Sequence, residues 1–142
     1  MGARTWCCIV LFYNTVYANI PDLDDIIPPN VFAAVIYVES AFDENAVGDD
    51  GKSYGLMQIQ LNTARDMGFK GTIKELMDPE TNIKYGTMYL VYLYKKTGDL
   101  FIALDAYNRG LGNVKKYPYK GDYKDHRYVG KVLKYLKGLK NE

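Results

Sequence analysis

Eight consecutive apolar residues, at positions 31–38, constrain the fold of this chain more than any other feature of its sequence. A run of this kind has no polar face, so the element that it forms must be buried on all sides. Periodicity cannot tell a helix from a strand in such a run, but Ala33 and Ala34 favour a helix. Glu39 follows directly, so a carboxyl group lies at the edge of the predicted core.

The rest of the chain predicts a mainly α-helical single domain with a small loop or hairpin insertion. Its 142 residues suit one compact domain. Residues 43–55 are rich in Gly, Asp and Asn, and predict a loop or a hairpin closed at Asp50-Gly51. The predicted helix starts are Asn62 or Thr63 for a short helix before Gly68, the capping box of Thr72 and Glu75, Asp78-Pro79 for residues 79–97, Asp99 for residues 100–108, and a last helix over residues 125–139.

The N-terminal segment predicts a secretory signal peptide, residues 1–18, followed by a catalytic domain over residues 19–142. Arg4 precedes a short apolar run at residues 6–13, which is too short to span a bilayer. Val16-Tyr17-Ala18 fits a cleavage site, although a first helix or strand packed on the core is the alternative. We therefore expect secretion to the periplasm, the cell exterior or the cell wall.

The charge distribution and the metal-binding residue types limit which partners and cofactors we expect. The formal net charge is +1, which does not indicate a nucleic-acid-binding protein, although residues 115–142 carry nine Lys and Arg against three Asp and Glu. That basic end is either a solvated helix face or a surface for an anionic wall or membrane. The adjacent Cys7 and Cys8 lack metal-binding spacing and His126 is the single histidine, so we expect no metal and no cofactor.

Three short clusters carry candidate chemistry. Glu39 is either a partly desolvated carboxyl, which would retain a proton as a general acid does, or simply the end of a buried helix. Gln58 lies in an apolar segment, where its amide either binds a substrate N-acetyl or hydroxyl group or satisfies nearby backbone. Tyr107 and Asn108 end a predicted helix, where Asn108 is either a C-cap or a site residue. Tyr128 by itself reads as ordinary core.

Together these clusters resemble the catalytic domain of soluble-type lytic transglycosylases, which are related to goose-type lysozymes. The resemblance spans about residues 26–137. The matching residues are Glu39-Ser40, Phe42, Asn45-Ala46-Val47, Gly-Leu-Met-Gln-Ile at 55–59, Thr63-Ala64, Leu76-Met77-Asp78-Pro79, Asn82-Ile83, Gly86, Tyr89-Leu90, Ala103-Leu104, Ala106-Tyr107-Asn108, Gly110, Asn113-Val114 and Tyr128-Val129.

The resemblance implies a lysozyme-like fold, peptidoglycan glycan strands as the substrate, and cleavage between N-acetylmuramic acid and N-acetylglucosamine with formation of 1,6-anhydro ends. It implies Glu39 as the catalytic residue. It implies substrate-binding or supporting roles for Ser40, Gln58, Tyr107, Asn108 and Tyr128. Two positions depart from the family pattern: Arg109 stands where alanine is usual, and Lys124 where glutamate is frequent, which puts substrate contacts near Lys124 in doubt.

Alternatives of other kinds stay open. A goose-lysozyme-like hydrolase needs a second acidic residue to hold a water molecule, and the candidates are Asp43, Glu44, Asp49, Asp50 and Asp105. A non-catalytic wall-binding module could retain the groove. A monomeric enzyme that opens the wall for a secretion, conjugation or phage-entry machine also fits the small size of the chain.

Overall fold

The computed structural model of the chain describes residues 27–140, without the side chain of residue 140. The predicted signal peptide and the two cysteines lie outside these residues. The elements are α2 (Pro29–Ser40), β1 (Val47–Gly48), η1 (Asp49–Gly51), β2 (Ser53–Tyr54), β3 (Ile59–Gln60), α3 (Leu61–Asp66), α4 (Ile73–Leu76), α5 (Pro79–Thr97), α6 (Leu100–Arg109), α7 (Leu111–Lys116), η2 (Tyr123–Asp125) and α8 (Arg127–Lys140).

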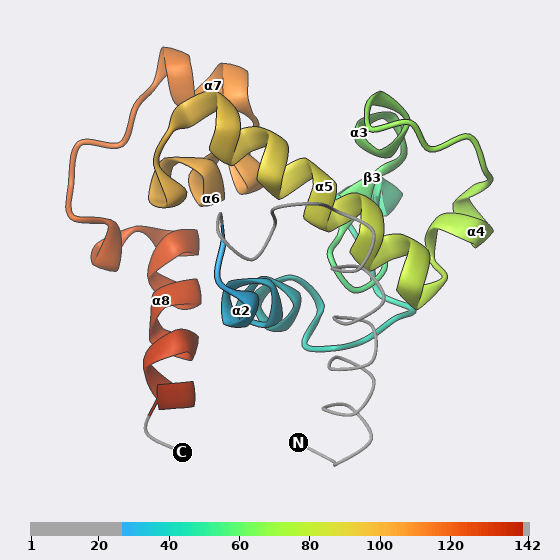
Figure 1. Ribbon diagram of the computed structural model, residues 1–142, viewed down its shortest axis with the longest axis horizontal. Coiled ribbons are helices and arrows are strands. Elements are labelled where there is room, and N and C mark those ends of the chain that lie inside the picture. The colour runs from blue at the N-terminus through green and yellow to red at the C-terminus, as the bar shows by residue number, and fades with distance from the viewer. Residues whose placement is uncertain (1–26, 141–142) are drawn as a thin grey trace.

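The apolar run forms the central helix α2, which confirms the prediction of a buried helix. Its residues 31–36 are all buried, and they join a core built also from α5, α6 and α8. Figure 1 shows α5 crossing the molecule between the side that carries α3 and α4 and the side that carries α6 and α7. On the latter side α8 packs against α2, and a contact of Tyr128 with Glu39 joins the start of α8 to the C-terminal end of α2.

A small antiparallel sheet follows α2, in the order β1-β2-β3. Gly48 pairs with Ser53 across the predicted hairpin, and Tyr54 pairs with Ile59 in the next. The hairpin prediction is therefore confirmed, but the third strand was not predicted because two residues carry no readable alternation. A second apolar cluster fixes the sheet to α3 and α4; it consists of Ile59, Ala64, Phe69 and Leu76.

Local capping chemistry sets three helix starts as predicted. The Thr72 hydroxyl accepts from the Glu75 backbone N–H at 3.2 Å, which begins α4. The Asp78 carboxylate accepts from Thr81 at 3.1 Å before α5, and Asp99 accepts from the backbone of Ile102 at 3.0 Å before α6. Each cap satisfies a backbone N–H that has no partner inside the helix.

Three boundaries differ from the predictions. Neither Asn62 nor Thr63 caps α3, because the chain enters α3 directly from β3 and both residues already lie within the helix. Helix α7 was missed, and Asn108 lies within α6 rather than at its C-cap, which is Gly110. Helix α8 begins two residues late, at Arg127, because the turn η2 occupies the preceding residues.

The faces of α8 agree with the predicted pattern. Val129 and Val132 are buried in the core, and Leu133 and Leu136 pack against it. The solvent side carries Lys131, Lys134 and Lys137. Within residues 27–140, no helix combines the length and the apolar character that a bilayer crossing requires.

Candidate active site

Glu39 lies in the last turn of α2, in a pocket of about 300 Å³. The start of α8 forms the opposite wall, where the Tyr128 hydroxyl donates a hydrogen bond to Glu39 Oε1 at 2.8 Å. Asn108 of α6 and two cations of α8, Arg127 and Lys131, also line this pocket. Three helices that are far apart in the sequence thus converge on a single carboxyl group.

The pKa of Glu39 is raised from 4.5 to about 7, and burial is the main cause. The hydrogen bond from Tyr128 lowers this pKa, since it favours the ionised form, whereas the negative charge of Asp49 raises it. Within the described residues Glu39 makes no ion pair with Arg127 or Lys131. A carboxyl group with a pKa near neutral can both give and take a proton under these conditions, as a general acid and base must.

The hydroxyl groups of Ser40 and Tyr107 bind backbone carbonyls and hold the segment between β2 and β3 in place. The Ser40 hydroxyl lies 2.8 Å from the carbonyl oxygen of Leu56 and 3.1 Å from that of Ile36. The Tyr107 hydroxyl donates to the carbonyl oxygen of Met57 at 2.6 Å. Burial, followed by the nearby charge of Glu39, raises the pKa of Tyr107 well above its usual value, so this phenol stays a donor.

Gln58 is held in a left-handed backbone conformation, with φ of 49°. Its side-chain Nε2 donates to the carbonyl oxygens of Ala46 at 3.0 Å and Gly55 at 2.9 Å. These two bonds use both amide hydrogens, so only the Oε1 acceptor remains for a ligand. A Cβ at Gly48 would lie 2.5 Å from that oxygen, which explains a glycine there.

A second pocket of about 250 Å³ lies on the sheet side and shares Asn108 with the Glu39 pocket. It is walled by the polar or aromatic residues Asp49, Gln58, Thr63, Tyr89 and Tyr107. A third pocket, of about 600 Å³, shares Val38 and Lys131 with the Glu39 pocket on the other side. It is lined by the stacked rings of Tyr37 and Tyr135, whose centroids lie 4.4 Å apart. The Glu39 pocket therefore shares lining residues with both of the other pockets.

Asn82 was included in the resemblance only as a matching residue, and its structural role was not predicted. Asn82 is fully buried in α5 and accepts from the Met57 backbone N–H at 2.8 Å. It donates to the carbonyl oxygens of Tyr54 at 2.8 Å and Leu76 at 3.0 Å. This amide satisfies the backbone beneath the Gln58 segment and fixes it to α5.

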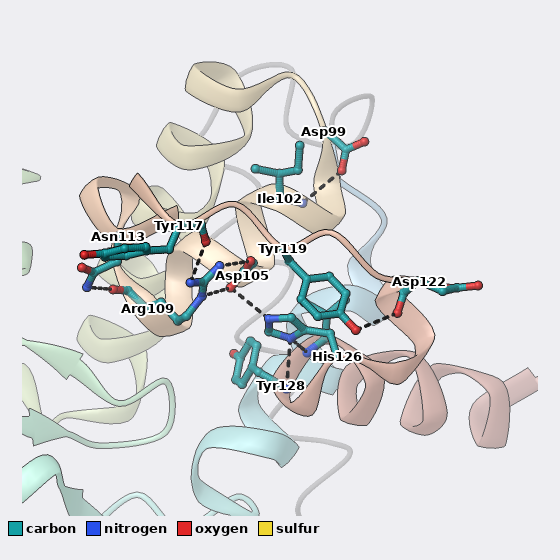
Figure 2. Close-up of polar contacts among 11 residues, drawn as sticks. Asp99, Ile102, Asp105, Arg109, Asn113, Tyr117, Tyr119, Asp122, His126 and Tyr128 are labelled. Atoms are coloured by element: carbon teal, nitrogen blue, oxygen red, sulfur yellow. Dashed lines mark hydrogen bonds and ion pairs between the residues drawn. The ribbon is translucent and has the colours of Figure 1, made fainter. Parts of the chain in front are cut away.

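A second missed feature is the contact network around Asp105 of α6, shown in Figure 2. Asp105 is fully buried and paired with Arg109, and His126 Nε2 lies 3.1 Å from it. The spacing of Asp105 and Arg109, four residues apart on a helix, could have predicted their pairing. Among residues 27–140, no group of three or more His, Cys, Asp and Glu side chains is arranged to bind a metal ion.

The chain is similar to known proteins of one family. The model of the transglycosylase SLT domain matches residues 17–128. The soluble lytic murein transglycosylase of Escherichia coli K12 is 36% identical over 112 residues, which cover 74% of this chain and 17% of that protein. The membrane-bound lytic murein transglycosylase F of Maricaulis maris is 38% identical over 91 residues, which cover 59% of this chain and 19% of that protein.

Solved structures show the same similarity. The 70 kDa soluble lytic transglycosylase of Escherichia coli superposes with a TM-score of 0.64 at 30% identity, covering 79% of this chain and 22% of that one. An inactive mutant of the lytic transglycosylase Slt from Pseudomonas aeruginosa superposes with a TM-score of 0.71 at 25% identity, covering 99% and 24%. The chain therefore spans about a fifth of the length of these relatives.

Proposed function

Since this chain belongs to the transglycosylase SLT domain family, we propose that it is a lytic transglycosylase that cleaves peptidoglycan glycan strands. The bond cleaved is the β-1,4 bond between N-acetylmuramic acid and N-acetylglucosamine, and the products carry 1,6-anhydro ends. The observation that carries the proposal is the Glu39 carboxyl, with its pKa near 7, in a pocket that shares lining residues with two neighbouring pockets. The relatives from Escherichia coli and Maricaulis maris are named lytic murein transglycosylases, which supports the same reaction.

The mechanism needs one group that first donates and then accepts a proton. Protonated Glu39 gives its proton to the glycosidic oxygen, and the bond from that oxygen to muramyl C1 breaks. The substrate N-acetyl group stabilises the cationic C1, and ionised Glu39 then takes the proton of the muramyl C6 hydroxyl. The C6 oxygen bonds to C1, so the anhydro ring closes without water and Glu39 is again protonated.

The remaining cleft residues have roles that follow from their contacts. Tyr128 occupies one oxygen of Glu39, which leaves the other free for the substrate. Asn108 borders two pockets, so its amide suits a sugar that lies across them. Gln58 contributes its free oxygen as an acceptor for a sugar N–H or O–H, while Tyr107 and Ser40 support the cleft by holding Met57 and Leu56.

Product analysis tests the reaction. Purified protein incubated with peptidoglycan should release muropeptides that are one water molecule lighter than hydrolysed ones, and mass spectrometry separates the two. Absence of anhydro products, with hydrolysed ones in their place, would contradict a transglycosylase.

A hydrolase is the second candidate, and Asp49 is the observation that favours it. Asp49 borders the sheet-side pocket and its charge acts on Glu39, so it could orient an attacking water molecule. Asp105 is unsuited to this role because Arg109 and His126 occupy it. In a transglycosylase Asp49→Asn should retain turnover; in a hydrolase the same change should abolish it.

We further propose that the protein acts in the periplasm or at the cell wall, where peptidoglycan lies. The predicted signal peptide belongs to this proposal, and N-terminal sequencing of the exported protein tests it: a chain that begins at Asn19 is expected. That the protein is a monomer stays a prediction. That it opens the wall for a secretion, conjugation or phage-entry machine is a second one.

A further inference from the structure

A cluster of polar and charged side chains joins α6 to the first turn of α8 (Figure 2). Asp105 lies at its centre and is fully buried. Arg109 donates to its two oxygens, from Nε at 2.6 Å and from Nη2 at 2.7 Å. This two-bond geometry fixes the orientation of a carboxylate as well as its charge. Asp105 is therefore a rigid acceptor on α6.

His126 lies between Asp105 and the start of α8 and contacts both. Its Nε2 lies 3.1 Å from Asp105 Oδ1, while its Nδ1 accepts from the backbone N–H groups of Tyr128 at 3.2 Å and Val129 at 3.1 Å. The two ring nitrogens therefore contact different elements, Nδ1 the backbone of α8 and Nε2 the carboxylate on α6. The first N–H groups of a helix have no partner within it, and here the imidazole supplies one. His126 thus caps α8 and ties that cap to α6.

Tyr128 links the cap to the active site. It is the second residue of α8, so its backbone N–H is held by His126 while its side-chain hydroxyl donates to Glu39 at 2.8 Å. A displacement of the helix start would move that hydroxyl with it. A continuous set of contacts therefore runs from Asp105 through His126 and Tyr128 to Glu39.

We propose that His126 is a positioning residue for the active site: it transmits the fixed position of Asp105 to the first turn of α8, and so keeps the Tyr128 hydroxyl on Glu39. The inference deepens the proposed function and rests on it for the role of Glu39. Figure 2 shows Tyr119 beside the imidazole. The Tyr119 ring lies edge-on with a centroid distance of 4.7 Å, and the Tyr123 ring lies at 5.6 Å, so the imidazole is confined by both rings.

The consequence for Glu39 can be measured. The groups that face its carboxyl are Tyr128, Arg127 and Lys131 of α8, Tyr107 and Asn108 of α6, and Asp49 of η1. Of these, Tyr128 donates the hydrogen bond that lowers the pKa of Glu39 against the effect of burial. A Tyr128 hydroxyl that is no longer held in place should therefore let the pKa of Glu39 rise.

The experiment is a double-mutant cycle read by carbon-13 NMR titration of glutamate side chains, with Glu39 assigned by its loss in Glu39→Gln. The proteins are the full chain, Tyr128→Phe, His126→Ala and the double variant. His126→Ala removes the cap of α8 and leaves Tyr128 and Glu39 themselves unchanged. Thr72→Ala is the matched control, since it also removes a helix cap, but on α4.

We expect both Tyr128→Phe and His126→Ala to raise the pKa of Glu39. In the double variant this pKa should be the same as in Tyr128→Phe alone. Residues that act through one contact are non-additive in this way. An unchanged Glu39 pKa in folded His126→Ala would overturn the proposal, and so would two shifts that add. Thr72→Ala should leave the pKa unchanged; a shift there would show that any loss of a cap has this effect, and would also overturn it.

If His126→Ala does not fold, His126→Asn replaces it. The asparagine oxygen can still accept from the N–H groups of α8, but its side chain is too short to reach Asp105, so the Glu39 pKa should again rise. With peptidoglycan as the substrate, the His126 variants should have a kcat about 10- to 100-fold lower and a nearly unchanged KM. Displacement of a catalytic group has this effect. Absence of turnover in the unmodified protein would refute the proposed function alone, because the NMR cycle needs no substrate.

Discussion

The Glu39 pocket and the Asp105 network each hold a carboxyl group away from bulk solvent, but they hold it differently. Asp105 is fully buried against the guanidinium of Arg109, which compensates its charge. Glu39 has only the neutral Tyr128 hydroxyl as a hydrogen-bond partner in the described part of the chain, and its pKa rises to about 7. The partners therefore differ: the two bonds from Arg109 fix the orientation of Asp105, whereas burial without a cationic partner among the described residues raises the pKa of Glu39.

The largest expected effect falls on turnover. Glu39→Gln preserves the shape of the side chain but cannot donate the proton, so the rate of peptidoglycan digestion should fall by about 10²- to 10⁴-fold. The exposed Glu44 provides the matched control, because Glu44→Gln removes a nearby carboxyl without touching the cleft. Equal loss in both variants, or undiminished digestion by Glu39→Gln, would remove the distinction between the two carboxyl groups.

The counterpart for Asp105 is a loss of stability. Asp105→Asn removes the buried charge that accepts both Arg109 bonds, so the free energy of unfolding should fall by about 2 kcal/mol. Urea denaturation measures this change. Asp122→Asn is the control, because the exposed pair of Asp122 with Lys124, at 3.7 Å, should be worth less than about 1 kcal/mol. A stability loss that is no larger for Asp105 than for Asp122 would contradict a structural role for the network.

The pH dependence of turnover sharpens the contrast further. Above the Glu39 pKa of about 7 the protonated form falls tenfold for each pH unit, so kcat/KM should be about 100-fold lower at pH 9 than at its plateau. The pH–rate profile of the free enzyme reports this pKa. A profile that stays flat between pH 7 and pH 9 is incompatible with Glu39 as the general acid.

The smallest effect is a gain in stability from the same Glu39→Gln change. Because the folded-state pKa of Glu39 exceeds its unfolded value of 4.5, the folded protein binds more protons between pH 4.5 and 7, and its stability falls as the pH rises through that window. Removing the carboxyl should therefore stabilise the fold at pH 8 and have almost no effect at pH 4. Thermal unfolding at the two pH values tests the sign, and equal effects would show that burial does not penalise the ionised form.

Features that depend on residues close together in the chain could be predicted from the sequence. The apolar run predicted α2, and the side chains of Thr72, Asp78 and Asp99 predicted the starts of α4, α5 and α6 because a cap and its N–H partner lie three residues apart. Glu39 stood out for the same reason, as an acidic residue directly after an apolar run.

Contacts across the fold were not readable. The sequence named Gln58 for its amide but left open whether it faced substrate or backbone, and the structure directs both amide hydrogens to the backbone. Asn82 and His126 gave no sign of their roles, since one holds the backbone of Met57 and the other caps α8 only after distant elements have packed.

By itself, then, the sequence determined the helical character of the chain, the buried helix α2 and the carboxyl at its end. Only the tertiary structure brought Tyr128 to Glu39 across 89 positions of sequence, and Tyr107 to Met57 across 50. The physical reason is range: caps and apolar runs act between covalent neighbours, whereas the pKa of Glu39 depends on the burial and the hydrogen bond that distant helices provide when they pack.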